Sequence, residues 1–245
     1  MTKGIDLLAV GPDGSLYAKV AKFLAETGVS TCTITDALDG LGVPNAVLDS
    51  RLTCRSRGTG MSFGAAYPVS WAPVRKNGDI SSAGPSTWSE VRDFLVPEVT
   101  DGTGMVYVGG AGRLVTEAAL AGGMSTTYLI ESLGFEGIVL GGAIRDREIV
   151  EKCDAAVVAS NFIPTDTQGS FRVVSVGQRC LIGDTLIARG DYVFTDGNGT
   201  VVVPQAVLRD TLAAAAAIEV RESMVMAQVR QGRRLPEMVD EVGQI

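Results

Sequence analysis

The sequence predicts an α/β fold with a long C-terminal helix, and three patterns support this fold class. Short apolar runs typical of buried strands occur at 104–108, 137–141 and 155–160. Amphipathic segments with helical spacing of apolar residues precede and separate these runs. Finally, a helical pattern starts at Pro204 and meets no further Gly or Pro until Gly232. A chain of 245 residues can bury such a core without disulfide bonds.

The N-terminal part of the chain is predicted to be helical. Apolar side chains recur at helical spacing over residues 15–27, with Ser15 as the expected N-cap and Gly28 as the stop. A second short helix is expected in the stretch TITDALDGLG, where Thr33 and Asp36 have the spacing of a capping box.

The next fifty residues give a weaker pattern. Residues 51–100 are rich in Gly, Pro and Ser and predict a single strand, around 58–66. Both tryptophans, Trp71 and Trp88, lie here, and either a packing role or a place in a pocket wall suits them.

A strand-helix-strand unit follows. The strand at 104–108 ends in a Gly-Gly-Ala-Gly turn, a helix is expected over 123–133, and the strand GIVLG begins at Gly137. The connection is long enough for a parallel strand pair.

The last part of the α/β region is predicted to contain short strands. After a short helix over 147–153, β-like segments at 171–176, 179–187 and 191–194 are separated by turn residues, which suggests a small antiparallel or barrel-like sheet. We expect one domain over 1–203, with the N-terminal helix included.

The remaining segment, 204–245, is expected to form a C-terminal helical arm and tail. A terminal helix of that length often reaches a neighbouring subunit.

Charge and segment composition restrict the class of function. Lys and Arg total 21 and Asp and Glu 28, so the net charge is 21 − 28 = −7. This charge disfavours nucleic-acid or anionic-membrane binding, because phosphates would be repelled. The sequence shows neither a membrane-spanning run nor the pattern of a signal peptide, so a cytoplasmic location is expected.

Two residue types restrict the chemistry further. The cysteines, Cys32, Cys54, Cys153 and Cys180, form no CxxC pair, and buried reduced thiols are expected. Histidine is absent, which excludes Ser-His-Asp and Cys-His nucleophile schemes. Any metal would therefore be held mainly by oxygen, as Mg²⁺ or Mn²⁺ is.

The stretch GGAIRD, which starts at Gly141, is the strongest candidate site. In an open α/β sheet, ligands bind beyond the carboxyl ends of strands, and two glycines there allow a close backbone approach. Arg145 offers a planar fork matched to a carboxylate, and Asp146 is a hard oxygen donor. The alternative is an ordinary turn with a surface ion pair, in which Asp146 caps the helix at 147–153.

Four stretches together resemble the RraA-like family, which includes the class II 4-hydroxy-4-methyl-2-oxoglutarate/4-carboxy-4-hydroxy-2-oxoadipate aldolases. In chain order they are STCTITDALDGLG, GGMSTTYLIESLG, GFEGIVLGGAIRD and GDYVFTDGNGTVVVP. The resemblance covers about residues 28–232. It implies a swivelling β/β/α domain that assembles into homotrimers or homohexamers, with active sites at subunit interfaces.

The resemblance also implies roles for individual residues. Arg145 would bind the keto oxygen of an α-keto acid and steady its enolate, and Asp146 would help to hold Mg²⁺ or Mn²⁺. A glutamate on the C-terminal helix of a neighbouring subunit would transfer protons. Glu222 is the best positional match for it and Glu219 the alternative, although both also suit an ordinary solvated helix face.

The helix start after Gly122 has a further implied role. Backbone amides of Gly123, Met124, Ser125 and Thr126 would bind the substrate carboxylate, as a helix N-terminus does. Here the chain departs from the family, because the acid that touches metal-bound water is replaced by Met124. Ser125 and Thr126 replace two leucines, so both the substrate and the metal dependence could differ.

These observations leave three hypotheses. The first is a metal-assisted carbon–carbon lyase, either aldolase or decarboxylase, acting on an α-keto acid through a pyruvate-like enolate. The second is a metal-independent enzyme on the same scaffold with a larger, less acidic substrate. The third is a non-catalytic binding protein, because some RraA-like proteins dock on RNase E.

Overall fold

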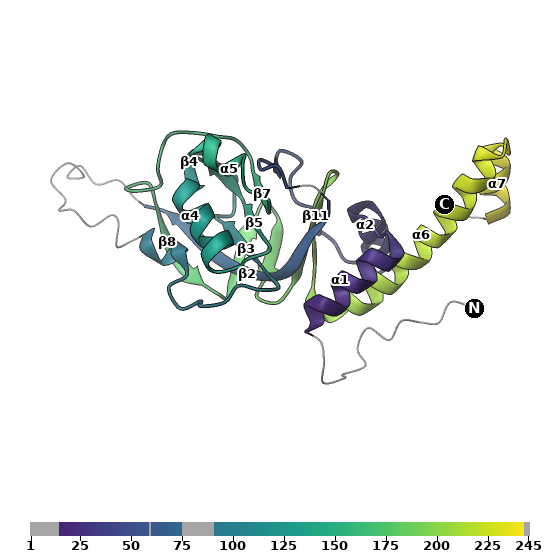
Figure 1. Ribbon diagram of the computed structural model, residues 1–245, viewed down its shortest axis with the longest axis horizontal. Helices are drawn as coiled ribbons and strands as arrows, with labels where there is room; N and C mark the ends of the chain where they lie inside the picture. The colour runs from purple at the N-terminus through teal and green to yellow at the C-terminus, as the bar shows by residue number, and fades with distance from the viewer. Residues whose placement is uncertain (1–14, 59, 75–90, 243–245) are drawn as a thin grey trace. The chain divides into compact units, whose positions relative to one another are not determined.

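The structure is a computed structural model that describes residues 15–58, 60–74 and 91–242, and it divides into two compact units. Unit 1 comprises residues 1–44 and 206–245, and unit 2 comprises residues 45–205. Unit 1 is helical, whereas unit 2 holds the strands together with the short helices between them (Figure 1).

Unit 1 contains four helices among the described residues: α1 (Leu16–Thr27), α2 (Thr31–Gly40), α6 (Leu208–Arg230) and α7 (Leu235–Val242). Ser15 caps α1 by accepting a hydrogen bond from Ala18 N, and Gly28 ends this helix in the left-handed conformation, as expected. In α2 the capping box is formed by Ser30 and Thr33, so the expected pair of Thr33 and Asp36 was wrong. Since Ser30 precedes the first helical residue, its hydroxyl reaches Thr33 N.

The C-terminal segment differs from the prediction at the start of its long helix and beyond Gly232. A 3₁₀ turn, η3 (Gln205–Val207), precedes α6, which then runs for 23 residues. Gly232, with φ 91°, breaks the helix where expected, and the chain continues into α7, which the sequence pattern did not predict. In addition, α1 belongs with α6 in unit 1, whereas we expected α1 within the α/β domain. The apolar face of α2 packs on α6 within this unit.

The main sheet of unit 2 has eight strands. Its order is β1-β7-β5-β3-β2-β11-β12, with β8 also paired to β2. The bounds of these strands are β1 (Thr53–Cys54), β2 (Ser62–Pro73), β3 (Met105–Gly110), β5 (Gly137–Leu140), β7 (Ala156–Ala159), β8 (Phe171–Val176), β11 (Tyr192–Asp196) and β12 (Gly199–Val203). Strands β2, β3, β5 and β7 are parallel, which confirms the parallel strand-helix-strand unit, while β1, β8, β11 and β12 pair antiparallel.

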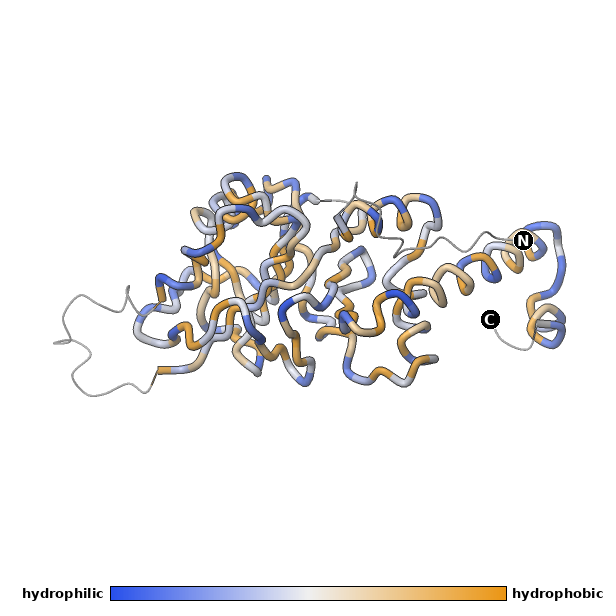
Figure 2. Tube along the Cα trace, turned by 90° about the horizontal axis from the view of Figure 1, so that it is seen from below, coloured by the Kyte–Doolittle hydropathy of each residue, from blue (hydrophilic) through white to orange (hydrophobic). Residues whose placement is uncertain are grey.

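The central strands are apolar throughout because both faces of the sheet are covered. Alternate residues of β3 enter different core clusters, Tyr107 on one face and Val106 and Val108 on the other. Strand β5 does the same with Ile138 and Val139. Figure 2 shows apolar residues, coloured orange, running through this strand-rich part of the chain.

Four further strands complete unit 2. The hairpin β9 (Arg179–Ile182) and β10 (Thr185–Ala188) divides what the sequence suggested as one segment. Strands β4 (Val115–Ala121) and β6 (Gly142–Ile144) form a small parallel sheet of their own, and β6 leads directly to Arg145. Among the helical parts, η1 (Arg92–Leu95) precedes β3, α4 (Gly123–Thr127) continues into a π-helical turn η2 (Tyr128–Ser132), and α5 (Arg147–Val150) follows β6.

Trp71 and the four cysteines differ in their burial. Trp71 is buried in the core, while Trp88 lies outside the described residues. All four cysteines are free thiols, as expected, but Cys180 alone of them is fully buried, and Cys32 and Cys54 are exposed. Within the described ranges, no helix combines the length and apolarity needed to cross a membrane.

Candidate active site

A pocket of about 440 Å³ in unit 2 brings the candidate residues together. Met124 and Ser125 of α4 line it, and so do Arg145, Asp146 and, from the chain after β7, Asp166. A volume of this size is within the range of sites that bind small molecules. The motifs at 122–126 and 141–146 therefore meet in one cavity, as the sequence suggested.

Arg145 is placed by the small sheet. Its backbone N–H donates to Ala121 O at 3.1 Å, which continues the pairing of β4 with β6. The preceding Ile144 is fully buried, so the backbone is fixed where the arginine emerges. The Arg145 side chain remains about one-third exposed and lines the pocket.

Asp146 adopts an unusual backbone conformation. Its φ of 61° and ψ of 54° lie in the left-handed region, which Asp tolerates better than most residues. It precedes α5 but its carboxylate makes no capping hydrogen bond to that helix. Instead, Asp146 Oδ2 accepts from Gly123 N at 2.8 Å, so Asp146 occupies the N-cap position of α5 without capping it through its side chain.

The two glycines at the start of α4 fit against these side chains. A Cβ on Gly122 would lie 2.7 Å from Asp146 Oδ2 and 2.9 Å from Arg145 Cγ, and one on Gly123 would lie 2.6 Å from Ile149 Cδ1. Only glycine therefore allows this close approach at both positions. By contrast, Gly142 approaches Val115 O, with a Cβ distance of 2.6 Å, so its role is strand packing rather than ligand contact.

The four candidate amides at the α4 start are not equivalent. The amide of Gly123 donates to Asp146, and that of Thr126 donates to Gly122 O at 2.9 Å. Met124 and Ser125 lie in the first turn, where helix N–H groups lack intrahelical acceptors. The Ser125 hydroxyl forms the capping box with Gly122, accepting from its N–H and donating to its C=O, both at 2.9 Å.

Asp166 is the residue that sequence reasoning missed. Its Oδ2 lies 3.1 Å from Arg145 Nη1, and its Oδ1 accepts from Thr167 N at 2.6 Å. Asp146 Oδ2 lies 3.9 Å from Arg145 Nε, at the outer limit of an ion pair. Two carboxylates thus hold the arginine. The only signal in the sequence is the short stretch PTDTQG after β7, whose residue types are typical of a turn.

The donor set can be tested against a divalent ion. The described residues contain no cluster of three or more Cys, Asp or Glu side chains placed to hold a metal. Mg²⁺, however, keeps several waters and needs only one or two carboxylates together with substrate oxygens. The Asp146 side chain is 44% exposed and lines the pocket, so it fits that kind of site. A cage made of protein ligands alone does not fit.

The candidate proton carriers lie elsewhere in the chain. Glu222 is half-buried on α6 in unit 1, and Glu219 lies one turn earlier on the same helix.

Thr126 is buried in the first turn of α4 and lines a second, smaller pocket together with Cys153.

Comparison with known proteins agrees with these motifs. A family model described as RraA-like, Aldolase/RraA, matches residues 31–202. A protein of Pseudomonas aeruginosa strain LESB58 named "Putative 4-hydroxy-4-methyl-2-oxoglutarate aldolase" is 35% identical over 109 residues, covering 43% of this chain and 64% of that protein. Protein DlpA of Legionella pneumophila is 25% identical over 84% of this chain and 31% of its own length.

The match to both curated relatives therefore spans less than two thirds of their length. Among solved structures, RraAS2 of Streptomyces coelicolor, described as an unusual member of the RNase ES inhibitor RraA protein family, superposes with a TM-score of 0.67 and 26% identity. That superposition covers 84% of this chain and 96% of the other. The family model extends from α2 to β12 and includes the Arg145-Asp146 pair, so this chain belongs to the RraA-like family.

Proposed function

We propose that this protein is a carbon–carbon lyase that acts on an α-keto acid and releases pyruvate through an enolate. The observation that carries the proposal is the placement of Arg145 in the pocket between Asp146 and Asp166. A guanidinium held in this way offers fixed donors to an oxygen on which negative charge develops. The aldolase name of the Pseudomonas aeruginosa relative supports the same reaction class.

In the proposed reaction, Arg145 binds the keto oxygen of the substrate. When the carbon–carbon bond breaks, its electron pair moves toward that oxygen, and the guanidinium stabilises the new charge by charge-assisted hydrogen bonds. The carboxylates of Asp146 and Asp166 would keep the Arg145 guanidinium in one orientation, so this side chain would need little reorganisation during the reaction. Decarboxylation of oxaloacetate would use the same stabilisation.

Asp146 has a second proposed role as the ligand of Mg²⁺ or Mn²⁺. A bound divalent ion would act as a Lewis acid toward the keto acid and orient it. The left-handed backbone at Asp146 turns its carboxylate toward the pocket, and the hydrogen bond from Gly123 N holds one oxygen there. The first-turn amides of Met124 and Ser125 are proposed to receive the substrate carboxylate.

Because the sequence contains no histidine, the proton carrier would be a carboxylate or, with a divalent ion bound, its water. Glu222 of a neighbouring subunit is the proposed carrier, within a homotrimer or homohexamer whose active sites lie at subunit interfaces. Glu219 is the alternative on the same helix.

The experiment measures pyruvate release with Mg²⁺ or Mn²⁺, from oxaloacetate and from 4-hydroxy-4-methyl-2-oxoglutarate. Arg145→Gln should lower kcat/KM by about 10²- to 10³-fold, the usual effect of removing one charge-stabilising donor. The matched control is Arg147→Gln, two residues on, because Arg147 pairs with Glu151 and stacks on Phe162 instead. Asp146→Asn should weaken divalent-ion binding measured by calorimetry.

Two results would contradict the proposal. One is the absence of pyruvate release from either substrate by folded protein at any metal concentration. The other is equal activity of the Arg145→Gln and Arg147→Gln variants. If metal has no effect but Arg145 is required, the metal-independent enzyme is the better account. If activity is absent and an RNase E-type endoribonuclease binds the Arg145→Gln variant as well as the wild type, the binding-protein hypothesis is favoured.

A further inference from the structure

The pocket has an apolar wall in addition to its charged residues. This wall is built from two segments: Val91, Phe94, Leu95 and Pro97 around η1, and Met124 and Tyr128 at the start of the α4–η2 helix. Met124 and Tyr128 are four residues apart, so they lie on one face of that helix. Apolar side chains therefore approach the pocket from two separate elements.

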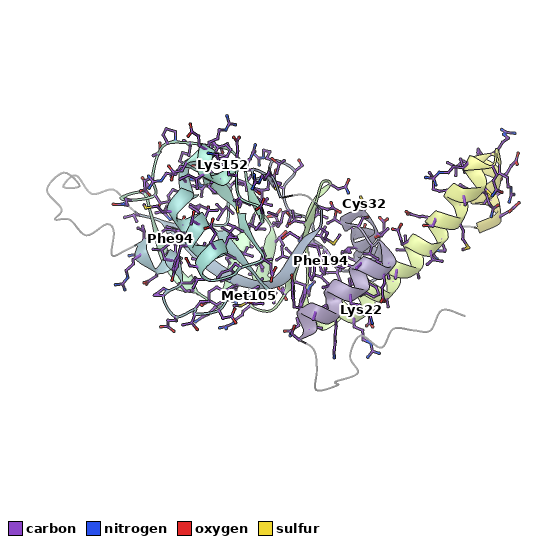
Figure 3. The ribbon with its side chains drawn as sticks, in the orientation of Figure 1. Lys22, Cys32, Phe94, Met105, Lys152 and Phe194 are labelled. Atoms are coloured by element: carbon purple, nitrogen blue, oxygen red, sulfur yellow. The ribbon has the colours of Figure 1, made fainter. Side chains whose placement is uncertain are left out.

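The η1 part of this wall is backed by the core. Val91 is 1% exposed and belongs to the main core cluster. The Phe94 ring packs on the buried Trp71 with 5.6 Å between ring centroids. Phe94, labelled in Figure 3, comes from η1, which also contacts β8. The wall is thus held in place before any ligand binds.

The helix part of the wall is apolar but open. Met124 is 77% exposed and Tyr128 36% exposed, although both are large and largely apolar. Methionine adapts its shape easily and packs well against aromatic rings. An apolar group entering the pocket would cover these side chains and remove them from water.

The charges around the pocket do not suit a second anionic group. Among the residues that the structure describes, the charged ones that line the pocket are Arg92, Arg145, Asp146 and Asp166, two cations and two anions. Arg145 is already engaged by both aspartates and, in the proposed function, by the keto acid. Arg92 is 63% exposed and lies 3.5 Å from Asp93, so water screens it. Within the described part of the chain, a further substrate carboxylate would find no buried cation in this pocket and would face two aspartates.

From these observations we infer that the substrate carries an apolar, preferably aromatic, group on C4 in place of a second carboxylate. This inference rests on the proposed function, and it names the substrate as a 4-hydroxy-2-oxo acid with an aryl or branched alkyl group at C4. The keto acid end contacts Arg145, and the apolar end contacts Phe94, Leu95 and Met124.

The corresponding reaction is balanced without any redox partner. The C3–C4 bond breaks, and its electron pair forms the enolate on C3, C2 and the C2 oxygen. The C4 hydroxyl loses its proton to a base as the C4–O bond becomes a carbonyl, and C3 then takes up a proton. The products are pyruvate and an apolar aldehyde or ketone.

Binding of two uncleavable keto acids tests the inference. Both 4-phenyl-2-oxobutanoate and 2-oxoglutarate carry the same keto acid end, but the first bears a phenyl group and the second a carboxylate. Calorimetry in the presence of Mg²⁺ should give a Kd at least tenfold lower for the phenyl compound. Equal affinity, or tighter binding of 2-oxoglutarate, would overturn the inference.

Variants locate the preference in the apolar wall. Leu95→Arg should reverse it, with the phenyl compound weakened about tenfold and 2-oxoglutarate strengthened. Because Leu95 is half-buried, Met124→Arg at an exposed position serves as the second variant and should act in the same direction. Leu186→Arg, at an exposed position of β10, is the matched control and should change neither Kd. Unchanged preference in both wall variants would also overturn the inference.

The inference and the proposed function can fail separately. Release of pyruvate and benzaldehyde from 4-hydroxy-4-phenyl-2-oxobutanoate supports both. Arg145-dependent cleavage of oxaloacetate without binding of the phenyl compound overturns the inference alone. Tight binding of the phenyl compound, without pyruvate release from any substrate, supports the apolar specificity and contradicts the proposed lyase.

Discussion

Gly122→Ala is the substitution that tests the packing behind Arg145 and Asp146 most sharply. Gly122 has φ −148° and ψ −170°, an extended conformation that alanine adopts freely, so the effect is steric only. The added Cβ would start 2.7 Å from Asp146 Oδ2, whereas comfortable contacts between non-bonded atoms are about 3.5 Å. The carboxylate must therefore move by roughly 0.8 Å, and Arg145 must move with it.

Such a movement should be far more damaging to activity than to stability. Misplacing a reacting group by about 1 Å costs on the order of 10²-fold in rate. The loss of stability should stay near 1 kcal/mol, the lower end for overpacking, because the displaced atoms belong to side chains that can move. Pyruvate release and urea unfolding measure the two quantities.

Gly197→Ala is the matched control for this substitution. Gly197 lies in the turn between β11 and β12, and a Cβ there would meet no atom within 4 Å. It should preserve activity, and its stability should stay within about 0.5 kcal/mol of the wild type. Wild-type activity in a folded Gly122→Ala variant would refute the reasoning, because the carboxylate would then have no need of its present position.

Three further results are expected. Asp166→Asn removes the 3.1 Å ion pair to Arg145, so kcat/KM for pyruvate release should fall about tenfold. The free energy of unfolding in urea should change by less than about 1 kcal/mol, because both side chains are one-third exposed. An unchanged kcat/KM would show that Asp166 has no role in the reaction. Thr126→Val should raise the free energy of unfolding by about 1 kcal/mol, because Thr126 Oγ1 is buried and has no hydrogen-bond partner among the described residues. A large loss of stability in this variant would contradict the prediction and indicate that the hydroxyl has a partner. Burial raises the pKa of the Cys180 thiol to about 12. A thiol reagent at pH 8 should therefore label the exposed Cys32 and Cys54 quickly and Cys180 only on unfolding. Fast labelling of Cys180 in the native protein would contradict its burial in the core.

Much of the fold could be predicted because its signals are local. The caps of α1 at Ser15 and Gly28, and the apolar runs of β3 and β5, depend on a few neighbouring residues. Strand β10 was merged with β9 into one predicted segment, and β4 was missed because its residues follow no regular alternation of buried and exposed positions. The grouping of the N-terminal helices with α6 involves the packing of α2 on α6, two segments far apart in the sequence, which no local pattern encodes.

The candidate site shows the same division. The Arg145-Asp146 pair could be found because its strand and glycines are contiguous in sequence. Asp166 could not, since its ion pair with Arg145 spans about twenty residues and β7. The glycines at 141 and 142 were misread as a ligand approach, because sequence alone does not show that Ile182 and Val115 fill the space beside them.

The central claim is that Arg145 stabilises the charge of an enolate more strongly than the charge of the keto acid from which it forms. Oxalate mimics the planar enolate of pyruvate, so its Kd can be compared with that of pyruvate by calorimetry in wild type and Arg145→Gln. The account predicts that wild type binds oxalate at least 10²-fold more tightly than pyruvate, and that Arg145→Gln loses most of this difference. An undiminished preference for oxalate in the Arg145→Gln variant would contradict the account.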